Sequence, residues 1–120
     1  MGGFSEIRWN VFLRAGNRKN AETLLKRIAK ALGEKIRVVD VVPERKEGTL
    51  FKATFSSPIG TARVQEAAFE SLRKAGELSH HWEVRTPQDY EGGRWDFAGW
   101  SNRKFRIAGI VAAEFEIANF

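Results

Sequence analysis

FRIAGIVAAEFEI, residues 105–117, is the stretch that decides the fold of this chain. Most of its bulky apolar side chains fall on odd positions, whereas its arginine and both glutamates fall on even positions. A period of two is typical of a β-strand with one apolar face and one mixed face. Such a strand must cover its apolar face with helices or with a second sheet. We therefore predict a long strand over residues 105–117 beneath amphipathic helices.

Apolar periodicity also assigns the elements that precede this strand. The predicted elements are a strand at 7–13, a helix from its N-cap Asn20 to its C-cap Gly33, strands at 36–42 and 50–55, a helix that starts at Ser57-Pro58 or Thr61 and ends at Gly76, and a strand at 80–84. The near-continuous apolar run at 36–42 is typical of a central strand or of burial on both faces. In the strand at 80–84, Trp82 and Val84 are expected to face inward.

The order strand, helix, strand, strand, helix, strand is typical of an α+β, ferredoxin-like fold. We therefore predict a βαββαβ antiparallel sheet with two helices on one face. The strand at 105–117 is expected to add to the edge of this sheet, alone or as part of a hairpin. A length of 120 residues fits a single domain over 1–120.

Composition narrows the class of protein. The net charge of +5 is uneven, since residues 1–60 carry 12 basic against 6 acidic side chains and residues 61–120 carry 8 against 9. A basic half is typical either of a solvated surface or of a surface that steers an anionic partner. The sequence has no cysteine, no apolar run long enough to span a membrane and no secretion signal at its start. We expect a cytoplasmic protein without membrane association.

No motif for catalysis or for a cofactor is found. His80 and His81 are neighbours on a predicted strand and point to opposite faces, so both cannot bind one metal ion. Glu114 and Glu116 share a strand face, where a carboxylate pair could serve acid–base chemistry, but charges on a strand also prevent edge-to-edge aggregation. No glycine-rich phosphate loop is present. We expect no enzyme activity, no metal and no cofactor.

The connection 87–104 is unusually rich in aromatic side chains for a loop. In one interpretation, residues 95–100 form a further strand with Trp95 and Phe97 on one face, which turns at Ser101-Asn102 into the last strand. In the other, the aromatic residues and their polar neighbours form a recognition surface, because tryptophan, tyrosine and arginine are enriched at binding hot spots. The candidate partner-binding residues are Tyr90, Arg94, Trp95, Asp96, Phe97, Trp100 and Arg103. Gly92-Gly93 permits a tight turn ahead of them.

The same strand order occurs in RNA-recognition domains, which stack bases on aromatic side chains of two central strands. One strand motif of those domains is approximated by residues 11–13, but the second is not matched at 48–53. A basic helix face could still bind phosphates without sequence preference. The residues of this alternative nucleic-acid face are Lys19, Lys26, Arg27 and Lys30.

Three segments carry a resemblance to a known family: Trp82-Glu83-Val84, the run from Trp95 to Gly99, and the ending Phe115-Glu116-Ile117. In these and in its length, the chain resembles the immunity proteins of contact-dependent growth inhibition and related polymorphic toxin systems of bacteria. The resemblance implies a small cytoplasmic protein that neutralises a cognate toxin domain by binding it. Many members directed at nucleases are acidic mimics of the substrate, whereas this chain is basic, which indicates an acidic toxin surface or a block away from the active site. A homodimer paired through an exposed sheet edge is an alternative that the sequence does not exclude.

Overall fold

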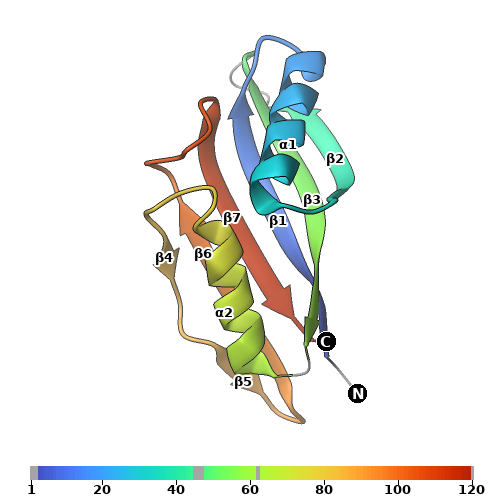
Figure 1. Cartoon of the computed structure of the whole chain (residues 1–120), viewed down its shortest axis with the longest axis vertical. Coiled ribbons are helices and arrows are strands. Elements are labelled where there is room, and N and C mark those ends of the chain that lie inside the picture. The colour runs from blue at the N-terminus through green and yellow to red at the C-terminus, as the bar shows by residue number, and fades with distance from the viewer. Residues whose placement is uncertain (1–2, 45–47, 62, 120) are drawn as a thin grey trace.

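One antiparallel sheet carries the fold, and both helices lie on the same face of it (Figure 1). The computed structural model describes residues 3–44, 48–61 and 63–119. In chain order the elements are β1 (Phe4–Arg14), α1 (Arg18–Leu32), β2 (Arg37–Pro43), β3 (Leu50–Thr61), α2 (Val64–Ala75), β4 (Glu83–Val84), β5 (Gln88–Tyr90), β6 (Arg94–Ser101) and β7 (Ile110–Ala118). The strands are arranged in the order β2-β3-β1-β7-β6-β4, and β5 pairs with β6. We call the face of the sheet without helices the open face.

The ferredoxin-like prediction is wrong, because the described residues form a sheet of seven strands and its order differs. In the predicted layout, the strand after the second helix completes the sheet and the C-terminal strand adds to an edge. Instead, β7 lies between β1 and β6, and β4 lies at the far edge. The length of β7 explains this strand order, since β7 pairs with residues 8–13 of β1. The two residues of β4 can pair only with Gly99 and Trp100 of β6.

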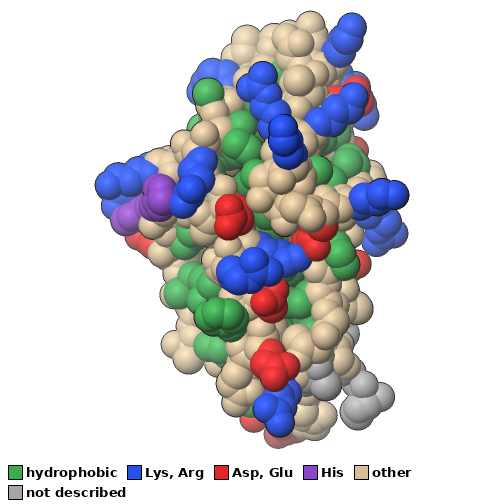
Figure 2. Space-filling model, in the orientation of Figure 1, with side chains coloured by type: hydrophobic (Ala, Val, Ile, Leu, Met, Phe, Trp, Pro, Cys, Tyr) green, Lys and Arg blue, Asp and Glu red, His purple; other side chains and the backbone are tan. Residues whose placement is uncertain are grey.

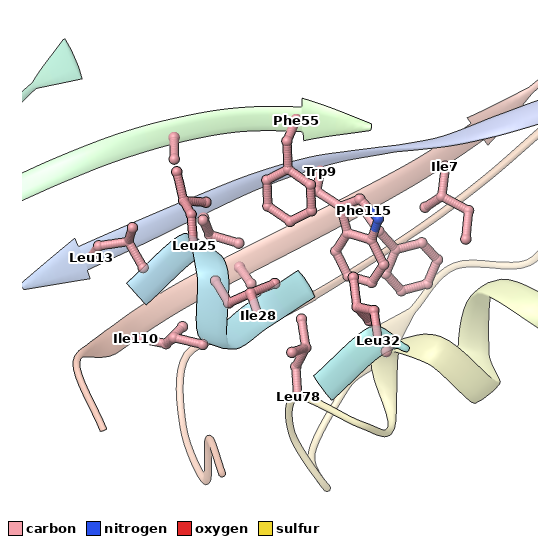
Figure 3. Close-up of a cluster of buried hydrophobic side chains, with 14 of the residues drawn as sticks. Ile7, Trp9, Leu13, Leu25, Ile28, Leu32, Phe55, Leu78, Ile110 and Phe115 are labelled. Carbon is pink, nitrogen blue, oxygen red and sulfur yellow. The ribbon is translucent and has the colours of Figure 1, made fainter. Parts of the chain in front are cut away.

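The core lies between the sheet and the two helices (Figure 3). β1 is its centre, because the alternation predicted for residues 7–13 places four fully buried side chains on the helix-covered face. The ring of Trp9 lies 5.9 Å from that of Phe55 on β3 and 5.7 Å from that of Phe115 on β7. Burying large aromatic rings provides much of the apolar area that drives folding. The sheet is thus held to its helices by side chains from all three central strands.

The strand predicted to be central is an edge strand. Among the described strands, β2 pairs only with β3, and of its valines only Val41 is buried. A break in register between Val38 and Asp40 adds to the exposure of the strand. β3 is longer than predicted and runs through Pro58, where the second helix was expected to begin. The pairing with β2 stops at Ser56, so the N–H that Pro58 lacks is not needed there.

The helices begin at other residues than predicted. The N-cap of α1 is Asn17, whose side chain accepts a hydrogen bond of 2.9 Å from the backbone N–H of Asn20, the predicted cap. At its other end, the predicted C-cap Gly33 is confirmed and has φ 74°, a left-handed conformation that glycine adopts without strain. α2 starts at Val64, later than either predicted start. It is closed by Gly76, as predicted.

The last two predicted strands are shorter than expected. β7 begins at Ile110, because Gly109 has φ 104° and ends the preceding loop. Phe105 forms one isolated bridge with Ser79 and packs against the core without belonging to a strand ladder. In the segment 80–84, only the last two residues are in a strand, and Val84 is exposed. Alternating apolar residues in a loop therefore mimicked a strand pattern.

A nearly buried ion pair ties α2 to the end of α1. The Lys74 ammonium contacts the Glu34 carboxylate, and their side chains are 9% and 19% exposed. We expect Glu34→Gln to lower the free energy of unfolding by about 2 kcal/mol, since the ammonium is left without a counter-charge. The control is Glu70→Gln, which removes the exposed pair with Arg73 and should change stability little. Equal losses in urea unfolding of the two variants would refute this role of the pair.

Candidate functional site on the open face of the sheet

The open face is built by the residues that alternate with the core residues of the central strands. Six residues of these strands lie between buried neighbours: Arg8 and Asn10 on β1, Glu114 and Glu116 on β7, and Ala98 and Trp100 on β6. Successive side chains of a strand point to opposite faces, so these six point away from the helices. Their order in space follows from the pairing of the strands.

The strand register places two glutamates beside Trp100. Trp100 is paired with Glu114 on β7 and with Glu83 on β4. Directly paired residues on one sheet face have Cβ atoms about 5 Å apart. The indole therefore has a carboxylate on each side, and Glu114 is held in place by a hydrogen bond of 3.0 Å from Asn10. An aromatic ring between two carboxylates attracts a cation.

One step along the strands, Ala98 makes the face hollow. Ala98 is paired with Glu116 on β7, and its carbonyl accepts a hydrogen bond of 3.2 Å from the backbone N–H of Arg85. Its methyl group leaves space between the larger side chains around it. The resulting pocket has a volume of about 560 Å³, and among its lining residues are Arg8, Arg85, Glu83, Glu114, Glu116 and Trp100.

Trp100 is the large aromatic residue exposed at this pocket. Its relative exposure is 45%, whereas Trp9 on the other face of the sheet has 0%. Exposed tryptophan combines a large contact area with an N–H donor, which is why it is frequent at the centres of protein interfaces. The pocket therefore offers an anchor, a hollow and charges of both signs within one surface.

A buried carboxylate positions Arg85 at the rim of the pocket. Asp96 is 8% exposed, and its Oδ2 lies 3.2 Å from Arg85 Nη2 and 3.1 Å from the Tyr90 hydroxyl. The Tyr90 hydroxyl and then the Asp96 carboxylate raise the pKa of Arg85 above its usual range, against the effect of burial. The other oxygen of Asp96, Oδ1, is buried and has no hydrogen-bond partner among the described residues. The guanidinium stays charged and fixed beside the hollow.

The predicted partner-binding residues are divided between two faces. Trp100, Tyr90 and Asp96 lie on the open face, since Tyr90 contacts Asp96. Phe97 is 3% exposed in the core, and Trp95 is half-buried against it. The prediction that 95–100 form a strand is thus confirmed, but the predicted turn at Ser101-Asn102 does not lead directly into the last strand, because β7 begins only at Ile110. The predicted turn at Gly92-Gly93 is tight, with φ of 80° and 78°.

The two predicted arginines lie at the ends of β6. Arg94 is exposed beside the turn and donates to the backbone carbonyl of Glu91 at 3.1 Å. Arg103 lies 2.7 Å from the ring of His81, and His80 faces Arg106 instead. Within residues 3–44, 48–61 and 63–119, no three His, Asp or Glu side chains are grouped so that they could hold a metal ion.

The residues that complete the site were missed by sequence reasoning. Glu83, Arg85 and Ala98 have no special spacing, and they meet only because β4, β6 and β7 are neighbours. The signal that could have found them is the alternation within RWDFAGWS, residues 94–101. It separates Trp100 from Phe97 and places Trp100 on the face of Ala98.

The predicted nucleic-acid face lies away from this site. Lys19, Lys26, Arg27 and Lys30 are exposed on α1, on the helix-covered side of the sheet. Figure 2 shows Lys and Arg side chains spread over α1 and the strands beside it. An RNA-recognition surface needs its aromatic rings and basic side chains on one face. Here Trp100 and the basic helix lie on opposite faces of the sheet.

Gly99 controls how closely β4, β6 and β7 approach. A Cβ atom at this position would lie 2.6 Å from Phe115 Cε2 and 2.9 Å from Val84 Cγ1. We expect Gly99→Ala to lower the free energy of unfolding by about 2 kcal/mol, as overpacking of a filled site does. Gly60→Ala is the control, because a Cβ atom there meets nothing within 4 Å. A thermal unfolding midpoint for Gly99→Ala equal to that of the control would disprove the close contact.

Comparison with known proteins adds no relative. No family model, curated protein or solved structure matches the chain. Among the described residues, neither helix is long and apolar enough to cross a membrane. The geometry of the open face is therefore the main evidence for function.

Proposed function

We propose that this chain is a protein-binding domain without catalytic activity, which captures its partner on the open face around Trp100. The observation that carries this proposal is a half-exposed tryptophan beside a hollow of about 560 Å³ on a face that no helix covers. Anchors of this kind account for much of the affinity of protein interfaces when a partner removes them from water. The buried Asp96 supports the proposal, because it fixes Arg85 before a partner binds.

The partner inserts a cationic side chain next to Trp100. Glu83 and Glu114 flank the indole through the strand register, and a lysine or arginine placed over the ring would contact the ring and both carboxylates. Ala98 leaves room for the aliphatic stem of that side chain. Arg8 on β1 and Arg85, which follows β4, line the same hollow and are suited to an acidic or carbonyl group of the same partner.

The role of this binding is the neutralisation of a cognate bacterial toxin domain in the cytoplasm. The resemblance of the sequence to immunity proteins supports this role, and the mixed charges of the open face suit a protein surface. Nucleic acid is the second candidate partner, and the exposed lysines and arginines of α1 favour it. The two candidates use opposite faces of the sheet, so single substitutions distinguish them.

The test uses the full chain as immobilised bait against a lysate of its source and against toxin domains encoded beside its gene. Three baits are compared: the unchanged chain, Trp100→Ala, and Phe69→Ala. Phe69 is a matched control, because it is an aromatic residue with 66% exposure on α2, on the other side of the sheet. We expect one protein to be retained by the unchanged chain and by Phe69→Ala, and to be lost with Trp100→Ala.

A growth assay then tests the specific role. Cells that express the captured toxin domain should survive with the unchanged chain and with Phe69→Ala, and should die with Trp100→Ala. A partner that is retained equally by all three baits would refute the open face as the site. Retention of RNA that is removed by moderate salt, and is insensitive to Trp100→Ala, would favour the nucleic-acid function instead.

A further inference from the structure

The edge strand β2 has one side that pairs with no described strand. β2 runs over Arg37–Pro43 and is hydrogen-bonded to β3 on its other side only. Backbone groups at such an edge can pair with an added strand, and folded proteins usually protect them with charges or with a cover. Here the middle of the strand is Val38-Val39-Asp40-Val41-Val42, with Val38 at 47% and Val39 at 62% exposure. The strand has some of the usual protection, since it contains Arg37, Asp40 and Pro43 and its register shifts between Val38 and Asp40, yet most of its valines stay exposed.

A groove accompanies this edge on the helix-covered side. It lies between α1 and β2, has a volume of about 860 Å³, and its apolar lining includes Leu25, Ile36, Val38 and Val41. Figure 1 shows α1 running along the sheet beside β2. An extended segment paired with β2 would place alternate side chains into this groove.

The rim of the groove is basic. Arg18, Lys19, Lys26 and Lys35 line it, against Glu22 and Asp40. Arg18 is paired with Glu22 at 3.6 Å, whereas the three lysines form no ion pair with a described residue. These lysines outnumber Asp40, so the rim keeps an excess of positive charge, which complements an acidic ligand.

We propose that the β2 edge binds an extended acidic segment of a partner protein, which adds to the sheet as a further strand beside α1. Backbone hydrogen bonds to β2 hold the segment, and its carboxylates on the groove side pair with Lys19, Lys26 and Lys35. The apolar side chains that alternate with them lie on the other face of the sheet, beside the exposed Val42. This surface is separate from the pocket at Trp100, since β2 and β4 are the opposite ends of the strand order. The proposal therefore does not rest on the function of the open face.

Two other occupants fit the groove less well. Among its lining residues there is no aromatic side chain on which a nucleic-acid base could stack. A second copy paired edge to edge through a two-fold axis would bring two basic α1 helices together. Like charges placed side by side oppose such a pairing. An acidic peptide satisfies the backbone, the valines and the lysines at once.

The experiment titrates a capped peptide of about eight residues, in which glutamate and valine alternate, into the isotope-labelled full chain. A peptide with lysine in place of glutamate is the charge control. We expect NMR shift changes in β2 and α1, slower amide exchange in β2, and no response to the lysine peptide. The double variant Lys19→Gln/Lys26→Gln should weaken binding about fivefold, because two exposed charge pairs are lost.

The matched variant is Arg27→Gln/Lys30→Gln, which makes the same change of charge on α1 at residues that do not line the groove. It should bind the glutamate peptide as the unchanged chain does. The proposal is overturned if the glutamate peptide does not bind, if the lysine peptide binds equally, or if the shift changes map to the open face. It is also overturned if a single-stranded oligonucleotide binds α1 more tightly than the peptide does. A dimer that sedimentation detects at the same concentration, together with NMR shift changes in β2 without peptide, would overturn it as well.

Discussion

Trp9→Ala is expected to lower the free energy of unfolding by about 4 kcal/mol, within the range for truncating a buried tryptophan. Trp9 is fully buried, and its ring contacts the rings of Phe55, Phe115 and Trp82. Its Nε1 donates a hydrogen bond of 2.9 Å to Ser57 Oγ, so the substitution also leaves that hydroxyl without its donor. The measurement is urea unfolding followed by circular dichroism.

A loss of this size could prevent folding, so Trp9→Phe is the second variant. Phenylalanine keeps most of the apolar volume and removes the hydrogen bond to Ser57. It should remain folded, with a loss of about 1.5 kcal/mol. If Trp9→Ala lost no more stability than Trp9→Phe, Trp9 would not be the centre of the core.

Trp100→Ala is expected to weaken the binding of the captured partner by about 3 kcal/mol, on the order of a hundredfold in Kd. The indole is the anchor of the open face, and the substitution removes both its contact area and the ring that attracts a cation between Glu83 and Glu114. Calorimetric titration of the purified partner measures the change. Stability should fall far less than with Trp9→Ala, because Trp100 is 45% exposed.

Charge substitutions distinguish the contribution of Trp100 to binding from that of the carboxylates beside it. The Glu83 side chain forms no hydrogen bond or ion pair with a described residue, so the effect of Glu83→Gln on binding reports a cation of the partner. If the pair is desolvated in the complex, Glu83→Gln should weaken binding mainly through faster dissociation. Phe69→Ala, on the other side of the sheet, should leave the Kd unchanged. An equal loss from Phe69→Ala would mean that the partner is bound by α2.

The sequence predicts the faces of the strands better than their neighbours. The alternation of residues 7–13 places Ile7, Trp9, Val11 and Leu13 in the core. Gly33 ends α1, as expected. The position of β7 beside β1 is not encoded in local periodicity, because it depends on which long strand can pair with β1 over its length. The valines of β2 predict a buried strand. This prediction is wrong, because apolar composition does not reveal that a strand lies at an edge.

The candidate site was predictable only in part. Trp100 stands out as an aromatic residue in an aromatic segment, but Phe97 shares that segment and is buried. Ala98 matters because it is small among large neighbours, and those neighbours come from other strands. The register of the sheet, which the sequence does not give, therefore decides the composition of the site.

The most direct test of the open face is the affinity of the captured partner for Ala98→Leu, measured by calorimetric titration. Leucine at this position fills the hollow from its floor and leaves Trp100 and the charged rim in place. Because the side chain points away from the core, the thermal unfolding midpoint should hardly change. We expect a Kd that is at least about tenfold weaker, since the partner's side chain can no longer enter the hollow. An unchanged Kd would show that the partner does not use this face.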